Sequence, residues 1–307
     1  MPHYGWDQFL VIAKRRRKEA SGRPSSLDIT LEGRTVEQVE EDIWKQGPYY
    51  SALTLRNSII GGLEIRTKKK GQPVENVIQI GCAGPGVAKP LMAYCELLKR
   101  LGADYGFLHK EHCCGLPLVE KRAFDGFKES ESQRQYQACR EFIGANIDMA
   151  RKLGAKAIYH FCVWCWIIAR RFYPDCDVAQ KYYPDLLVDL LKDKPLRVKP
   201  QTVAYFPGGT HGWTVAAGEG ADWDADWPGY RKLLDRIEGL TVVDVPLYCC
   251  LVTRDPIYKR AEPHGTLLTN CVRCYGNLQR NAPPGVRVRS YPDFLLEALE
   301  TASETRA

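Results

Sequence analysis

Residues 77–82 read VIQIGC, residues 112–117 read HCCGLP and residues 157–166 read AIYHFCVWCW. The first and third segments begin with a short apolar run that is typical of a buried strand, and each run ends at a cysteine. A strand pattern at residues 103–108 also precedes the second segment, and helical patterns at residues 89–101 and 133–153 separate the three strands. This alternation predicts an α/β fold with a parallel sheet, in which each cysteine group follows a strand.

The same order recurs in the second half of the chain. Strand patterns at residues 202–206, 241–245 and 265–269 precede the segments PGGTH at residues 207–211, Cys249-Cys250, and CVRC at residues 271–274. Such self-similarity is the signature of an internal repeat. We therefore predict two Rossmann-like βα repeats, at residues 74–195 and 196–307, preceded by an N-terminal extension at residues 1–73.

The cysteines of the first repeat have the pattern of metal ligands. Neighbouring side chains diverge, so Cys113 and Cys114 are poor partners for a single tetrahedral ion, but each can bind a different iron of a multinuclear cluster. Parallel sheets collect ligands at the carboxyl ends of their strands, where three loops can converge. We predict a five-thiolate iron-sulfur site formed by Cys82, Cys113, Cys114, Cys162 and Cys165.

Two other interpretations of these cysteines remain open. Buried cysteines often act as small apolar core residues. The pair Cys162 and Cys165 also has the spacing of a thioredoxin-like redox motif, placed between a strand and a helix start where thiol pKa values fall. Neither interpretation accounts for the grouping of all five residues after strands.

The second repeat keeps four cysteines and loses the fifth. Matching the strands places Gly209, or alternatively Thr210, where the first repeat has Cys82, and Leu251 replaces the glycine after the second cysteine pair. Four cysteines can hold a cubane 4Fe-4S cluster, a 2Fe-2S cluster or zinc, or can be vestigial structural thiols. His211 is a candidate nitrogen ligand. The expected metal ligands of this site are Cys249, Cys250, Cys271 and Cys274.

Several residues near the first motif could assist chemistry. His109 and His112 flank the cysteine pair, and His112 is a candidate proton donor to a departing thiolate, with structural hydrogen bonding as the alternative. Trp164 and Trp166 could shield a cluster from water or pack as core residues. Three further cysteines have no counterpart in either repeat and receive no function: Cys95, Cys139 and Cys176.

The order Cys82, Cys113-Cys114-Gly115 and Cys162-x-x-Cys165 resembles the CCG domain of the B-type subunit of heterodisulfide reductase and its relatives, over about residues 77–293. In that family the five cysteines of one motif bind a non-cubane 4Fe-4S cluster, and two motifs usually occur in one chain. The resemblance implies a duplicated CCG domain that cleaves or forms S–S bonds of a thiol, disulfide or sulfur substrate at its cluster. The five cysteines of the first motif would then be both cofactor ligands and catalytic residues.

The resemblance also implies partners. A ferredoxin-like iron-sulfur subunit and a flavin-containing subunit would exchange electrons with this chain, which lacks the cysteine run of a bacterial ferredoxin. Loss of the fifth thiol in the second motif is similar to the B-type subunit of the heterodisulfide-reductase-like complex of sulfur-oxidising prokaryotes. The alternative is a non-catalytic electron-relay subunit, as in the related chains of lactate, glycolate or succinate oxidation. Access of a thiol to the first cluster separates the two.

Composition is consistent with a cytoplasmic globular protein. The chain has 307 residues, of which 45% are apolar and 26% are charged, and neither a signal peptide nor a membrane span is expected. Twelve cysteines in such a chain favour metal or redox chemistry in a reducing compartment. The net charge is +6, and basic residues cluster at residues 14–18 and 66–70. We interpret these clusters as a solvated face, with a docking patch for an acidic partner or nucleic acid as the alternative; the interleaved aromatic residues that would favour nucleic acid are absent.

The N-terminal extension contains no cysteine and carries both basic clusters. Val36, Val39 and Ile43 follow Thr35 at helical spacing, which predicts one short helix over residues 35–44. We expect the extension to be a docking arm for a partner rather than a part of the chemistry.

Overall fold

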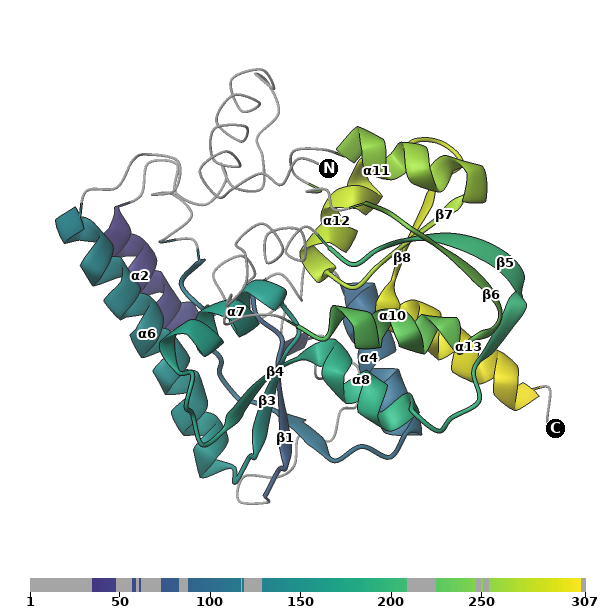
Figure 1. Cartoon of the computed structure of the whole chain (residues 1–307). Coiled ribbons are helices and arrows are strands. Elements are labelled where there is room, and N and C mark those ends of the chain that lie inside the picture. The colour runs from purple at the N-terminus through teal and green to yellow at the C-terminus, as the bar shows by residue number, and fades with distance from the viewer. Residues whose placement is uncertain are drawn as a thin grey trace. The chain divides into compact units, whose positions relative to one another are not determined.

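The computed structural model describes residues 35–47, 57–58, 61, 73–82, 88–116, 118, 129–208, 225–246, 250 and 254–304. The chain divides into two compact units (Figure 1). The first unit contains residues 1–86 and 104–181, and the second contains residues 87–103 and 182–307.

The first unit is built on a four-stranded sheet with the strand order β2-β1-β3-β4. Strand β1 runs parallel to both of its neighbours, β2 and β3. The strands are β1 (Asn76–Gln79), β2 (Tyr105–Phe107), β3 (Ala157–His160) and β4 (Ala179–Tyr182). The helices of this unit are α2 (Val36–Gln46), α6 (Glu129–Lys152) and α7 (Val163–Phe172).

The second unit contains a sheet with the corresponding order β6-β5-β7-β8. Its strands are β5 (Arg197–Phe206), β6 (Glu238–Asp244), β7 (Thr266–Thr269) and β8 (Arg287–Ser290). The helices assigned to this unit are α4 (Ala88–Arg100), α8 (Tyr183–Leu191), α10 (Trp227–Asp235), α11 (Arg254–Ala261), α12 (Val272–Arg280) and α13 (Tyr291–Glu304), with the short 3-10 helix η2 (Glu262–His264).

The two sheets share one topology, which confirms the predicted α/β fold with two repeats. In each sheet the first strand lies between the second and the third, and the neighbours of this central strand are parallel to it. The register places Gln79 beside His160 in one sheet and Phe206 beside Thr269 in the other. The cysteine loops of each repeat therefore leave from the carboxyl edge of its sheet.

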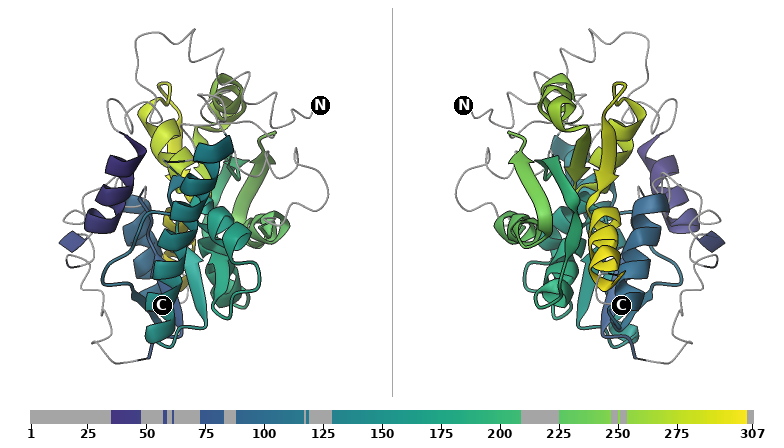
Figure 2. Two further views of the ribbon diagram at one scale, coloured as in Figure 1. Left: turned by 90° about the vertical axis from the view of Figure 1, so that its left-hand side faces the viewer. Right: turned by 90° about the vertical axis from the view of Figure 1, so that its right-hand side faces the viewer.

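The compact units do not coincide with the two sequence repeats. Helix α4 follows β1 in the chain but packs against α13, as the right-hand view of Figure 2 shows, where α13 is yellow and α4 blue. Arg100 of α4 forms an ion pair with Glu300 of α13 at 2.7 Å. Helix α8 likewise follows β4 but packs against α10. Both helices bury their apolar faces in the second unit, although the sequence places them in the repeat at residues 74–195.

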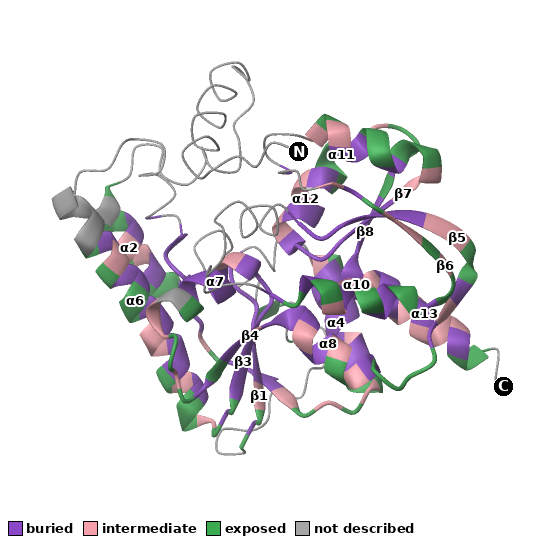
Figure 3. Ribbon diagram, in the orientation of Figure 1, coloured by how far each residue is buried: buried purple, intermediate pink, exposed green. Residues whose placement is uncertain are grey.

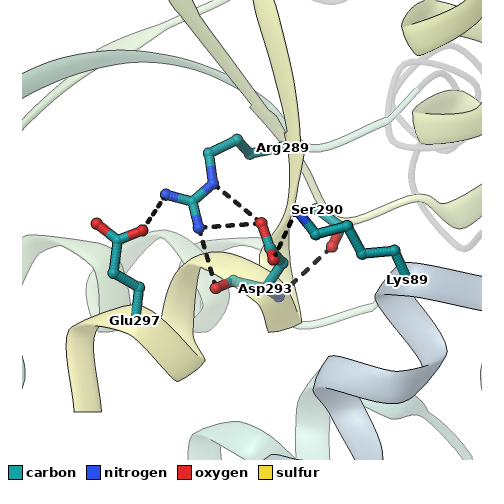
Figure 4. A network of polar contacts seen from close by, with 5 residues as sticks. All are labelled: Lys89, Arg289, Ser290, Asp293 and Glu297. Atoms are coloured by element: carbon teal, nitrogen blue, oxygen red, sulfur yellow. Dashed lines mark hydrogen bonds and ion pairs between the residues drawn. The ribbon is translucent and has the colours of Figure 1, made fainter. Parts of the chain in front are cut away.

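The strands β1 and β3 are almost wholly buried, whereas exposed residues line the outer faces of the helices (Figure 3). A buried charge lies where β8 meets α13. Arg289, only 5% exposed, donates to Asp293 Oδ2 at 3.0 Å and to Glu297 Oε2 at 2.5 Å (Figure 4). Lys89 of α4 reaches the other Asp293 oxygen at 3.2 Å. Two carboxylates thus compensate a guanidinium that is almost removed from water.

Candidate metal centre

The loop after β1 is held by a carboxylate from the segment after β2. Glu111 is fully buried, and its two oxygens accept the backbone N–H groups of Ile80 at 3.0 Å and Gly81 at 2.9 Å. Charge-assisted hydrogen bonds of this kind are stronger than neutral ones. Glu111 therefore fixes the backbone directly before Cys82.

Gly81 brings this loop against the third cysteine segment. The residue has φ +71°, and a Cβ atom here would lie 3.0 Å from Cys165 Sγ and 3.2 Å from Cys162 Cβ. Cys162 is the N-cap residue of α7, and Cys165 lies in the first turn of that helix. Only glycine combines this backbone conformation with this close approach.

The five cysteines of the first motif form one continuous group of thiols. Cys113 forms hydrogen bonds with the thiols of Cys82 and Cys114, and Cys165 forms them with the thiols of Cys114 and Cys162. All five residues are buried, and no disulfide joins the described cysteines. The structure thus brings together the five residues that the sequence assigned to one site.

The environment favours the protonated form of these thiols. Burial raises the pKa of Cys113 well above its ordinary value, and the hydrogen bonds with Cys114 and Cys82 raise it further. For Cys165 the hydrogen bonds with Cys114 and Cys162 are the main cause of a raised pKa, and burial adds to them. Because thiolates and not thiols bind metals, loading this site must release protons.

The donor set is chemically compatible with an iron-sulfur cluster. Among the described residues, no three His, Cys, Asp or Glu side chains are arranged to hold one metal ion. Ligands of an iron-sulfur cluster bind different irons and need no common centre. A contiguous group of five sulfur donors, from three loops at one sheet edge, meets this requirement.

His112 is held by its surroundings. Its backbone N–H donates to Asn146 Oδ1 at 2.8 Å, and its carbonyl accepts from Asn146 Nδ2 at 2.9 Å. The ring Nδ1 lies 3.2 Å from the Ile43 carbonyl oxygen. The Trp44 ring packs edge-on against the His112 ring, with 4.8 Å between the ring centroids. Burial lowers the pKa of His112. These contacts are structural, and proton delivery by His112 stays a prediction. His109 is exposed.

The tryptophans of the third segment differ in their surroundings. Trp166 is buried and donates its indole N–H to the Gln180 carbonyl at 3.2 Å, whereas Trp164 is half-buried against the core. His160, at the end of β3, contacts Gln180 Oε1 through Nε2 at 2.8 Å, and burial lowers its pKa to about 4. His160, which interacts electrostatically with Cys114, therefore stays neutral near pH 7.

The second repeat reproduces part of this geometry. Gly208 lies beside the CVRC segment much as Gly81 lies beside Cys162, since a Cβ atom at Gly208 would be 2.7 Å from Cys271 Cβ. Because Gly208 corresponds to Gly81, the next residue in the sequence, Gly209, aligns with Cys82. Gly209 itself, Thr210, His211, Cys249 and Leu251 lie outside the described residues.

The described cysteines of the second motif also adjoin one another. The thiol of Cys274 forms hydrogen bonds with the thiols of Cys250 and Cys271, which together with burial raise its pKa. The backbone N–H of Cys274 donates to Cys271 Sγ at 3.4 Å. The structure therefore brings together three of the four predicted ligands.

Cys139, which received no function from the sequence, lies beside the first site. It is fully buried on α6, and its sulfur fills the space that a Cβ atom on Gly115 would occupy. Gly115 has φ +79°, so the glycine of the Cys-Cys-Gly tripeptide serves both turn and packing. In the sequence, a glycine at position 115 indicates that another residue packs closely there, but the sequence does not show that this residue is Cys139.

The other two unassigned cysteines differ in burial. Burial on α4 raises the pKa of Cys95 to about 12, and Cys176 is half-buried with its thiol 3.6 Å from an Asp177 carboxylate oxygen.

None of the described helices is both long enough and apolar enough to cross a membrane. No model of a known protein family matches the chain, and no curated protein or solved structure does so either.

Proposed function

We propose that the first motif binds one iron-sulfur cluster and that the chain is the iron-sulfur subunit of a heterodisulfide-reductase-like complex, which cleaves or forms S–S bonds. The observation that carries this proposal is the continuous group of five buried thiols, joined by hydrogen bonds and delivered by three loops of one sheet. The motif order that resembles the CCG domain supports the choice of reaction.

The bound non-cubane 4Fe-4S cluster would supply a binding position for a substrate sulfur and single-electron transfer. The chain's own part is to hold and shield it. Cys82, Cys113, Cys114, Cys162 and Cys165 supply the thiolates, with Glu111 and Gly81 fixing the first loop. Burial of the thiols keeps bulk water from the site.

The second motif would hold a different centre or none. Glycine has no side chain to bind iron, and a neutral threonine hydroxyl is a poor match for a soft thiolate site. With Gly209 at the position of Cys82, the thiols of Cys249, Cys250, Cys271 and Cys274 suit a cubane 4Fe-4S cluster, a 2Fe-2S cluster or zinc. The proposed chemistry therefore occurs at the first site alone.

Electrons would pass through other subunits. The chain lacks a bacterial ferredoxin run, so a ferredoxin-like subunit and a flavin-containing subunit are the proposed partners. A cytoplasmic location is part of the same proposal, since cysteine thiols persist in reducing compartments.

An electron-relay role without substrate contact is the second candidate. All five thiols of the first motif are at most 5% exposed, which favours electron transfer over direct access of a bulky disulfide. Access of a small thiol to the loaded site distinguishes the two functions.

The test is metal and sulfide analysis of anaerobically purified protein, with electron paramagnetic resonance before and after adding a small thiol. We expect iron and acid-labile sulfide together, and a spectrum that changes on thiol addition. Replacing Cys82 or Cys113 by serine should abolish the first-site signal, whereas Cys176→Ser should preserve it. Full iron content and an unchanged spectrum in Cys82→Ser would refute the ligand assignment, and a signal insensitive to thiols would favour the relay.

A further inference from the structure

The C-terminal end of helix α2 is capped by the segment that carries Cys113. The last four carbonyls of an α-helix lack donors within the helix. Here Lys110 Nζ donates to the Trp44 carbonyl at 2.7 Å, and the Cys113 N–H donates to the Gly47 carbonyl at 3.1 Å. The ring Nδ1 of His112 lies 3.2 Å from the Ile43 carbonyl oxygen. The cysteine loop thus donates hydrogen bonds to the Trp44 and Gly47 carbonyls at the helix end, while the Ile43 carbonyl also accepts the Gly47 N–H at 2.8 Å.

In return, the helix end orders the loop. The Cys113 residue is buried, so its N–H would lose its partner if Gly47 moved away. Gly47 has φ +84°, and a Cβ atom there would run into the Glu111 carbonyl oxygen. The Trp44 ring packs against the His112 ring and also against the Phe142 ring, whose centroid lies 5.0 Å from that of Trp44. Cys113 is therefore fixed by Gly47 through its backbone and by neighbouring thiols through its side chain.

Helix α2 is anchored mainly by burial. The Thr35 hydroxyl accepts from the Gln38 N–H at 3.3 Å in a capping box, and the apolar stripe of Val39 and Ile43 is fully buried. On the surface, Arg134 of α6 reaches Glu37 at 3.0 Å, but such exposed pairs contribute little. The buried stripe and the hydrogen bonds to the cysteine loop thus contribute most to holding α2 in place.

We infer that α2 is a clamp on the Cys113 loop, with Ile43, Trp44 and Gly47 as positioning residues for the five-thiol site. Occupancy of the site then stabilises α2, and displacement of α2 loosens the site, because coupling between two sites is reciprocal. The described part of the N-terminal extension acts on the site itself, beyond the docking role expected from the sequence. This inference rests on the proposed function only for what occupies the site.

The decisive variant is Gly47→Ala in the full chain, studied metal-free under anaerobic conditions. Alkylation by iodoacetamide, mapped by mass spectrometry, reports how often each thiol becomes accessible. We expect Cys113 and Cys114 to react faster by roughly tenfold, the factor that about 1.4 kcal/mol of lost local stability produces. Cys271 and Cys274, which lie in the second unit, should react as before.

Gly285→Ala is the matched control. Gly285 has φ +87°, close to that of Gly47, but nothing lies within 4 Å of a Cβ atom there. It therefore places an alanine at a similar positive φ without the contact to the loop. If both variants alter alkylation equally, or if Gly47→Ala accelerates all cysteines alike, the clamp is refuted. Lys110→Met removes the hydrogen-bond donor to the Trp44 carbonyl and should give a smaller increase in the alkylation rate of the same two cysteines. This variant replaces Gly47→Ala in the experiment if Gly47→Ala does not fold.

The reciprocal effect is measured on the wild-type chain reconstituted with iron and sulfide. Hydrogen exchange at the backbone amides of α2 should slow on loading, whereas exchange in α10 of the second unit, which packs against α8 and β6, should not change. Loading without slower exchange in α2 would overturn the clamp. Failure of the protein to take up iron and sulfide would count against the proposed function, while the alkylation experiment would still decide the clamp.

Discussion

The carboxylate of Glu111 lies on the backbone of Gly81, with Oε1 accepting the Gly81 N–H at 2.9 Å. Its other oxygen accepts the N–H of Ile80 at 3.0 Å. A side chain from the second cysteine loop thus determines the path of the first, one residue before Cys82. The convergence of the loops depends on this buried acid as well as on the cysteines themselves.

Glu111→Gln should weaken this link. The amide keeps one accepting oxygen and replaces the other by a donor, so one of two buried N–H groups loses its partner. An unsatisfied buried group costs about 1–3 kcal/mol, and we expect a loss of that size in the unfolding free energy of the metal-free protein, with reduced iron content. Denaturant unfolding and iron analysis measure both. The exposed exchange Glu304→Gln should alter neither, and full iron content in Glu111→Gln would show that Cys82 needs no such support.

The contact between Gly115 and Cys139 predicts non-additive substitutions. Gly115→Ala should destabilise the protein more than Gly102→Ala, because Gly102 also has positive φ but no atom lies within 4 Å of its added Cβ. Cys139→Ala removes the sulfur that a new Cβ would meet, so the double variant should recover part of the loss. Coupling energies of about 0.5–3 kcal/mol are usual for residues in contact. Additive unfolding free energies would contradict the proposed packing.

Gly209→Cys should add a fifth thiol to the second motif. The shared relation of Gly81 and Gly208 to their CxxC segments puts residue 209 at the position of Cys82. We expect the variant to bind more iron and sulfide than the wild-type protein. Thr210→Cys, one residue further along, is the matched control and should bind no more than the wild type. Equal gains from both variants would show that the alignment of the two loops is wrong.

The charges around Arg289 predict losses of stability of different size for two substitutions. Asp293→Ala leaves a nearly buried guanidinium with Glu297 as its remaining carboxylate partner, and removing one partner of a buried pair costs about 3–5 kcal/mol. Lys89→Ala removes an exposed partner of the same aspartate and should cost at most about 1 kcal/mol. Thermal unfolding of both variants measures the difference. Equal losses would mean that Arg289 does not depend on Asp293.

Periodicity and turn residues predicted the cap of α2 and six of the described strands, but not β4 and β8. The expected strand at residues 157–161 is β3, Ala157–His160, and Thr35 caps a helix that extends two residues beyond the expected end at Trp44. The grouping of the five thiols also followed from sequence, because parallel strands deliver their loops to one edge. These features depend on local chemistry and on a topology that the alternation of elements specifies.

The supports of the site could not be predicted in this way. Glu111 and Gly47 act through hydrogen bonds between residues far apart in the chain, and no periodic pattern records such pairs. In the sequence, Cys139 is an ordinary helical residue, and only the structure shows that it packs against Gly115. The assignment of α4 to the second unit depends on which apolar face it meets, and the amphipathic pattern of α4 does not specify its partner.

The packing of α4 against α13 has a consequence for biosynthesis. Residues 88–100 leave the ribosome early, yet the helix that covers their apolar face is formed by residues 291–304. During translation the leucines of α4 therefore lack their packing partner in α13 until almost the whole chain has been synthesised. The packing of α4 is thus completed only after α13, the last helix of the described chain, has been synthesised.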